Sequence, residues 1–216
     1  MLQIKKSARG FTVIELMFAM TFLAVLLIIL LVSVIQITRT YNKGVTLKRV
    51  DQSGRNIGQE VQQAIQQAGS TAVYVDGKLC LGDYSFVWSQ PATSINGHTV
   101  DAIDNKYDDG HDTPVGFAKV KDATLCDSPT ATQIPKSQSI ELLGDGLVMR
   151  QPTELIADQD NNRLLTFKYT ISTPDDGGGV FSFLSPTEDE LHCTGDSGDE
   201  FCALSTFVVT AYAKGL

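Results

Sequence analysis

The chain lacks the residue patterns on which most enzymes and nucleic-acid-binding proteins depend. Its three histidines are scattered, and no pair of its four cysteines has the close C-x-x-C spacing of a zinc site. No Lys-Ser/Thr pair follows the glycine run at residues 177–179, which excludes a phosphate-binding loop of the Walker type. Basic residues interleaved with aromatic ones are missing, so no specific nucleic-acid site is evident, and no motif selects a carboxylate pair as acid and base. We therefore predict no catalytic residues, no cofactor and no enzymatic activity.

Charge is also nearly missing from residues 11–38, where Glu15 is the only ionised side chain. As a helix, these 28 residues would reach about 42 Å, more than the roughly 30 Å hydrocarbon core of a bilayer. Three cations and no acid precede the run, which predicts a cytoplasmic amino terminus and an external location for everything after Arg39. The run is too long for a cleaved secretory signal, and no small-x-small cleavage site follows it. A single membrane-spanning segment is expected.

Glu15 is difficult to reconcile with a simple membrane anchor. A carboxylate within the hydrocarbon layer costs several kcal/mol unless it is paired. A free amine at Phe11, created by cutting the Gly10–Phe11 bond, would neutralise it, most readily from a neighbouring copy in an assembly. Gly10 suits such a cut because it has no side chain to hinder a protease.

The short basic leader ending in Gly10, the sequence Phe-Thr-Val-Ile-Glu-Leu at residues 11–16 and the apolar helix behind it resemble the prepilins of type IV pili, type II secretion pseudopilins and competence pili. The resemblance is specific over residues 5–35 and loose beyond them. It implies a class III signal peptide over residues 1–10, cleaved after Gly10 by a prepilin peptidase, and N-methylation of Phe11. It also implies that Glu15 contacts a neighbour's amino terminus, with other pilin subunits and a pilus assembly platform as partners. Many family members carry a helix-kinking proline where this chain has Val32.

Beyond the membrane run, small or apolar residues recur at steps of three and four, the period of one helix face. They are Leu47, Val50, Gly54, Ile57, Val61, Ile65 and Ala68. One helix is predicted over residues 11–68, with a transmembrane and assembly half (11–38) and an amphipathic half (39–68). The alternative is two helices with a break near residues 42–44. Three glycines each weaken the helix by about 1 kcal/mol relative to alanine. They are Gly44, Gly54 and Gly58.

From residue 71 onward the apolar pattern has a period of two, which indicates strands. The predicted strands cover residues 71–75, 78–81, 84–89, 115–120, 139–143, 146–150, 155–157, 164–171, 180–184 and 204–213. Residues 90–113 and 121–136 are expected to be loops. A long helix followed only by strands predicts an α+β fold, with one antiparallel sheet wrapped over the helix as a head domain of residues 69–216. The family resemblance implies the same pilin fold.

All four cysteines lie beyond the membrane run and therefore outside the reducing cytoplasm. Their even number favours two disulfides, for which three pairings are possible. Cys193 and Cys202 flank a short polar loop that a bridge would close easily, which favours this pair and leaves Cys80 with Cys126.

Acidic residues crowd into residues 101–112. The oxygen-bearing and imidazole side chains there are Asp101, Asp104, Asn105, Asp108, Asp109, His111 and Asp112. Carboxylates at this density can hold Ca²⁺, which makes Asp104, Asp108 and Asp109 weak candidates. The EF-hand pattern fails, because Tyr107 takes the third ligand position if Gly110 is the sixth. We favour a solvated acidic loop and predict no metal.

The whole chain of 216 residues has a net charge of −8. Without the leader, 14 basic and 25 acidic side chains remain, a net charge of −11. An acidic exterior favours solubility and disfavours unspecific binding to DNA phosphates or anionic headgroups.

Together with the resemblance, these patterns predict a structural subunit of a type IV pilus or related filament. Within the resembled family, the size of the chain and the helix segment at residues 50–57 look more like a minor pilin or J-type pseudopilin than a small major pilin. The alternatives are a major pilin and a non-polymerising single-pass anchor that presents an extracytoplasmic binding domain. Before assembly the chain is expected in the cytoplasmic (inner) membrane, and afterwards in a cell-surface pilus or periplasmic filament. The resemblance implies a role in adhesion, twitching motility, DNA uptake or secretion.

Overall fold

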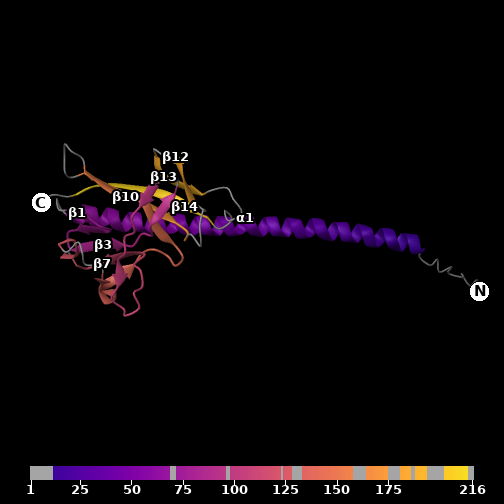
Figure 1. Ribbon diagram of the computed structural model, residues 1–216, viewed down its shortest axis with the longest axis horizontal. Helices are drawn as coiled ribbons and strands as arrows, with labels where there is room; N and C mark the ends of the chain where they lie inside the picture. The colour runs from indigo at the N-terminus through magenta and orange to yellow at the C-terminus, as the bar shows by residue number, and fades with distance from the viewer. Residues whose placement is uncertain are drawn as a thin grey trace, which may run out of the picture. The chain divides into compact units, whose positions relative to one another are not determined.

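The computed structural model describes residues 12–68, 72–95, 98–122, 124–127, 133–157, 164–174, 181–185, 188–193 and 202–213. The fold is α+β: one long amino-terminal helix, α1 (Val13–Gln67), is followed by strands and two short 3-10 helices (Figure 1). Contacts divide the chain into two units, Met1–Asn42 and Lys43–Leu216, and α1 contributes to both. The alternative of a break near residues 42–44 is wrong, because residues 13–67 are helical without interruption.

In the first unit, the helix is stabilised within itself. Between residues 13 and 42 there is no glycine or proline to weaken it. Its hydroxyl side chains bond to carbonyl oxygens three or four residues earlier, as Ser33 does to Ile29 at 2.8 Å. Every residue from 12 to 41 is exposed in this single chain. This stretch therefore has no core of its own.

In the second unit, the helix buries one face. The buried residues lie at helical spacing, as the sequence predicted, and are Val50, Ser53, Gly54, Ile57, Gly58, Val61, Ala64 and Ile65. The helix ends at Gln67, one residue before the predicted end at Ala68. Amphipathic patterning thus fixed both the helical state and the face that packs.

The larger sheet has five antiparallel strands in the order β1-β2-β3-β7-β9. Their bounds are β1 (Ala72–Val75), β2 (Lys78–Leu81), β3 (Tyr84–Trp88), β7 (Phe117–Val120) and β9 (Ser139–Glu141). The turn between β1 and β2 is Asp76-Gly77, with φ of 43° and 73°. Positive φ at both positions is what a tight two-residue hairpin requires, and Asp-Gly is a favoured pair for it.

The second sheet has three antiparallel strands in the order β10-β11-β14, namely β10 (Val148–Ala157), β11 (Leu164–Ser172) and β14 (Leu204–Tyr212). The sequence predicted two separate strands where β10 is continuous. Its register with β11 shifts between Arg150 and Glu154, a segment that contains Pro152. Proline has no N–H to donate to a ladder, so the interruption in the apolar pattern marks an irregularity within one strand.

The expectation of a single sheet is wrong, and some short elements were missed. Two-stranded pairs join β4 (Thr93–Ile95) with β5 (His98–Val100), β6 (Lys106–Tyr107) with β8 (Gln133–Ile134), and β12 (Phe181–Ser185) with β13 (Glu188–Cys193). The 3-10 helices are η1 (Thr124–Cys126) and η2 (Lys136–Gln138). Most of these lie in the segments expected to be loops. They were missed because elements of two or three residues are too short to show a period.

Both sheets pack on the buried face of α1 and share one core. A row of aromatic rings crosses it: Trp88 stacks on Phe117 at 5.6 Å between ring centroids, and Phe167 stacks on Tyr169 at 5.2 Å. Ring pairs at these separations add roughly 0.5–1.5 kcal/mol each beyond the area they bury. The strands are thereby held along the carboxy-terminal part of the helix (Figure 1).

Candidate functional site

Helix α1 starts with a reciprocal hydrogen-bonded cap. Glu15 accepts a hydrogen bond from the Thr12 backbone N–H at 3.0 Å and from the Thr12 hydroxyl at 2.8 Å, both at Oε2. The Glu15 backbone N–H in turn donates to the Thr12 hydroxyl at 3.4 Å. A threonine followed three residues later by glutamate forms the capping box that satisfies donors at a helix start. The Glu15 carboxylate therefore has a partner within its own chain, which the sequence analysis did not foresee.

The carboxylate is only partly engaged by this cap. Neither cap bond reaches Oε1, and no partner contacts that oxygen within the described residues. A carboxylate has room for about four hydrogen bonds, so Glu15 can keep the cap and still accept a cation. Capping and neutralisation by a neighbour are thus compatible.

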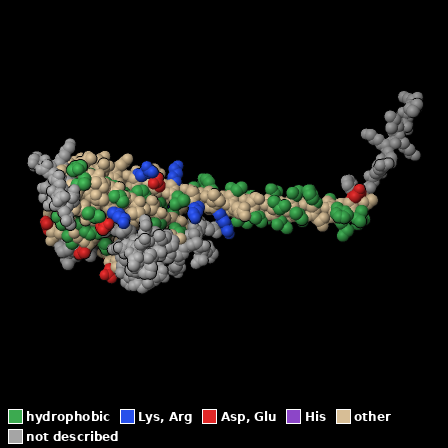
Figure 2. Space-filling model, turned by 90° about the horizontal axis from the view of Figure 1, so that it is seen from above, with side chains coloured by type: hydrophobic (Ala, Val, Ile, Leu, Met, Phe, Trp, Pro, Cys, Tyr) green, Lys and Arg blue, Asp and Glu red, His purple; other side chains and the backbone are tan. Residues whose placement is uncertain are grey.

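The surface around Glu15 is apolar on every side. Large hydrophobic side chains from Val13 to Ile37 are exposed to between 40% and 78% of their full area. Figure 2 shows these apolar side chains along the helix. The helix is long and apolar enough to cross a membrane, with a mean hydropathy of 3.0 in its most apolar window. A surface of this kind is stable in lipid or against other apolar helices, and is unstable in water.

Hydroxyl groups along this apolar stretch are hydrogen-bonded within the helix. Thr21 donates to the Phe18 carbonyl at 2.9 Å, and Thr38 donates to the Val34 carbonyl at 2.9 Å. Polar groups in hydrocarbon must be satisfied internally, and these are. Glu15 remains the one ionisable group among residues 12–38.

The predicted processing residues, Gly10 and Phe11, lie outside the described residues. Cleavage between them and methylation of Phe11 stay predictions, as does the contact between Glu15 and a neighbour's amino terminus.

Two helix glycines form a close-packing site in the head. A methyl group built on Gly54 would lie 2.1 Å from Cζ of Phe207 on β14, and one on Gly58 would lie 3.0 Å from the Tyr169 hydroxyl. That hydroxyl donates to the Gly54 carbonyl at 2.6 Å. Burial raises the pKa of Tyr169. The glycines that weaken the helix by propensity thus let the second sheet approach its backbone.

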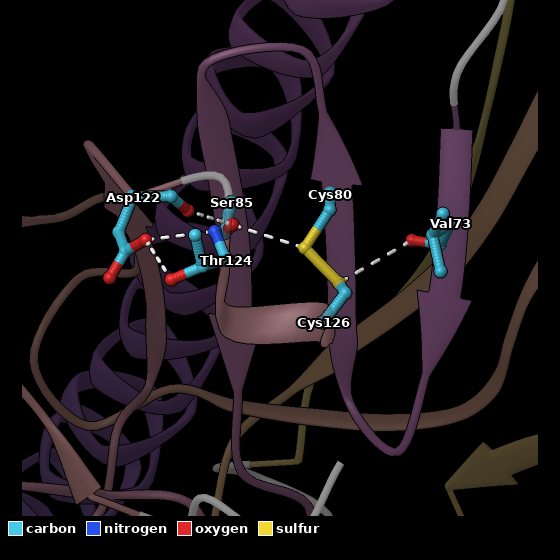
Figure 3. The surroundings of a disulfide bond; sticks show 6 residues. All are labelled: Val73, Cys80, Ser85, Asp122, Thr124 and Cys126. Carbon is cyan, nitrogen blue, oxygen red and sulfur yellow. Dashed lines mark hydrogen bonds between the residues drawn. A yellow bond between two sulfur atoms is a disulfide. The ribbon is translucent and has the colours of Figure 1, made fainter. Parts of the chain in front are cut away.

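The structure contains two disulfides. Their pairing is the one expected from the short polar loop between Cys193 and Cys202. Cys80 on β2 is bonded to Cys126 in η1, and Cys193 at the end of β13 is bonded to Cys202. Figure 3 shows the surroundings of the Cys80–Cys126 bridge. The Val73 carbonyl lies 3.8 Å from the Cys126 sulfur, and the Ser85 hydroxyl contacts the Cys80 sulfur. This bridge ties the segment after β7 back to the first hairpin.

The candidate calcium ligands do not converge. Asp104 is paired with Lys106 and Asp109 with Lys136, each at 3.0 Å, and Asp108 is exposed. The pKa of Asp109 is lowered, chiefly by the His111 backbone N–H and also by Lys136. Within the described part of the chain, no three His, Cys, Asp or Glu residues are grouped so as to hold a metal ion.

A cleft of about 420 Å³ in the head was not predicted. At its wall, Glu141 accepts hydrogen bonds from the Tyr107 hydroxyl at 2.6 Å and from the Phe117 N–H at 2.6 Å. Burial and this bond raise the pKa of Tyr107. In the sequence, the signal for this role was that Glu141 is the one acidic residue in the predicted strand 139–143. These bonds fix Glu141 as a structural anchor for the β7–β9 edge.

No protein-family model, curated protein or solved structure matches this chain. The fold is compatible with a pilin-like architecture, because a long apolar amino-terminal helix packs its second half on antiparallel sheets.

Proposed function

We propose that this chain is a prepilin-type filament subunit, cut after Gly10 and assembled through the first part of helix α1. The observation that carries the proposal is Glu15: one carboxylate follows the predicted cleavage site within a helix that is otherwise apolar on all sides. Lipid covers such a surface before assembly, and the helices of neighbouring copies cover it afterwards. The amine released at Phe11 then pairs with Oε1 of a neighbour's Glu15, which compensates the cost of a carboxylate in an apolar medium.

The finer assignment is a minor pilin or J-type pseudopilin. It is supported by the size of the chain and by the helix segment at residues 50–57, which resembles those subunits more than a small major pilin. A major pilin would dominate sheared surface filaments, whereas a minor subunit would be a small fraction of them, so quantitative immunoblotting of sheared filaments separates the two.

A second candidate function is a single-pass anchor that presents the head without polymerising. The cap between Thr12 and Glu15 favours it, because this cap gives the carboxylate a role that needs no neighbour. The two candidates differ in what they require of Glu15. An anchor requires a hydrogen-bonding cap, and a filament subunit requires a negative charge.

The deciding experiment replaces Glu15→Gln in the full-length chain. Glutamine keeps the capping box but carries no charge. We expect the variant to insert in the membrane at the wild-type level and to be missing from sheared filaments. Normal filament incorporation of Glu15→Gln would overturn the filament proposal and leave the anchor.

The matched control is Thr12→Val, which removes the hydroxyl half of the cap and leaves the charge. It should lower helix stability by about 1 kcal/mol and still assemble. Mass spectrometry of the mature amino terminus completes the test: a chain starting at methylated Phe11 supports the processing step, and a chain retaining Met1 contradicts it.

A further inference from the structure

Cations concentrate on one part of the helix in the unit Lys43–Leu216. Lys43, Lys48, Arg49 and Arg55 all lie exposed within residues 43–55, a segment we call the basic collar. Asp51 is its one acid, and it pairs with Arg55 at 3.0 Å. The collar therefore has a net charge of +3, while the chain beyond residue 55 has 9 basic and 23 acidic side chains. Figure 2 shows Lys and Arg side chains gathered on this part of the helix.

An acidic loop in the same unit carries the opposite charge. Residues 101–112 contain five aspartates, two of which pair with Lys106 and Lys136. Three negative charges remain, and Asp101, Asp108 and Asp112 are exposed. None of the ion pairs among the described residues joins the collar to the acidic loop of the same copy.

We propose that the basic collar of one copy docks on the acidic loop of a second copy. The inference rests on the proposed function and requires that two copies of this chain be neighbours in the filament, and it adds a second contact to the one at Glu15. The charges match at +3 and −3, so docking neutralises both surfaces. Complementary charge of this kind fixes the register of two surfaces and hinders wrong pairings.

Anionic lipid headgroups fit the collar less well than a second copy does. Twelve helical steps from Lys43 to Arg55 extend about 18 Å. The headgroup region of one leaflet is only about 5–8 Å thick, so it can contact one end of the collar and not the whole. An acidic loop of twelve residues on a second copy is not confined to a layer of that thickness, so it can contact the whole collar.

Cross-linking between two distinguishable copies tests the contact. A full-length chain with Arg49→Cys and one tag is co-expressed with a full-length chain with Asp108→Cys and a second tag, and their membranes are treated with a short bismaleimide. The native cysteines are in disulfides and do not react. The expected product is a dimer that carries both tags. The matched control is Gln63→Cys in place of Arg49→Cys, an exposed position of the same helix about 21 Å from Arg49, which should give about ten-fold less dimer.

Charge exchange then separates docking from mere proximity. Lys48→Glu with Arg55→Glu on the first chain should lower the two-tag dimer about ten-fold, and Asp101→Lys with Asp112→Lys on the second chain should restore it. A dimer yield no higher than that of the control, or one insensitive to charge reversal, would overturn the proposal. The proposal would also be overturned if charge reversal in the collar changed only the amount of phosphatidylglycerol that co-purifies with the chain and left the dimer yield unchanged. Because the assay uses membranes and not filaments, a negative result here leaves the Glu15 experiment and the proposed function standing.

Discussion

The two parts of helix α1 use the same kinds of side chain in opposite ways. Ile29 is 56% exposed within an apolar surface that surrounds the helix, whereas Ile57 is fully buried against the sheets of the head. Before residue 42 the helix is held by bonds between neighbouring turns, and after residue 43 it is held by residues more than a hundred positions away, such as Tyr169. The first part makes an exposed apolar surface, and the second part makes a core.

The distribution of glycine and charge explains this difference. The first part has no glycine, and up to residue 38 it has no charge apart from Glu15, so this stretch has no face that prefers water. The second part alternates small, apolar and polar residues at helical spacing, so one face packs and the other is solvated. The folded head can thus be stable in water while the surface before it is stable only when covered.

The largest expected effect comes from removing the Cys80–Cys126 disulfide by Cys80→Ser with Cys126→Ser. The bridge spans 46 residues, so the chain-entropy model assigns it about 4 kcal/mol of the head's unfolding free energy. Thermal unfolding in detergent should show an early loss of the near-ultraviolet signal of the head, while the helical signal of residues 13–42 persists. The control, Cys193→Ser with Cys202→Ser, opens a bridge over 9 residues and should cost about 2.7 kcal/mol. A larger loss for the shorter bridge would contradict this order.

Truncation of matched isoleucines tests the comparison within one helix. Ile57→Ala opens a cavity in the core and should lower the unfolding free energy of the head by about 3 kcal/mol. Ile29→Ala removes the same atoms from an exposed site and should leave the head's urea midpoint unchanged. If Ile29→Ala destabilised the head as much as Ile57→Ala does, the two parts of the helix would not be energetically separate.

Much of this architecture could be predicted from the sequence, because its signals are periodic. Small or apolar residues at steps of three and four indicated the packed face of α1, and the Asp76-Gly77 pair is typical of the tight turn in the first hairpin. The division of the strands into two sheets could not be predicted, since pairing such as that of β11 with β14 joins residues about 40 positions apart. The register shift between Arg150 and Glu154 looked like a gap between two strands because the apolar pattern is interrupted there.

The candidate site shows a similar limit. Glu15 was found because a charge in an apolar run is conspicuous, yet its bond to Thr12 was missed although a threonine three residues before a glutamate is a known cap. The role of Gly54 was also missed, because its contact with Phe207 depends on tertiary packing.

Alanine at two glycines should change stability in opposite directions. Gly54→Ala places a methyl group against the Phe207 ring, and this overpacking should exceed the gain of about 1 kcal/mol in helix propensity, for a net loss of about 1–2 kcal/mol. Gly44→Ala has nothing within 4 Å of the new methyl and should gain about 1 kcal/mol. Urea unfolding of both variants measures the difference. Adding Phe207→Leu should restore part of the loss at Gly54, and an unchanged loss would show that Phe207 is not the obstacle.

The smallest expected effect is at Tyr169, whose hydroxyl joins the second sheet to the helix. Tyr169→Phe removes its bond to the Gly54 carbonyl and should cost about 1 kcal/mol at pH 7. Because burial raises the folded pKa of Tyr169 above its ordinary value near 10, its contribution is full below about pH 10 and is lost as the pH rises further. Wild type should therefore lose more stability than Tyr169→Phe between pH 9 and pH 11, so that the two urea midpoints converge. Tyr212→Phe, at an exposed position of β14, serves as the control and should run parallel to wild type at both pH values. A gap between wild type and Tyr169→Phe that stays constant to pH 11 would show that the hydroxyl is solvated, and that the sheet and the helix are joined there by apolar packing alone.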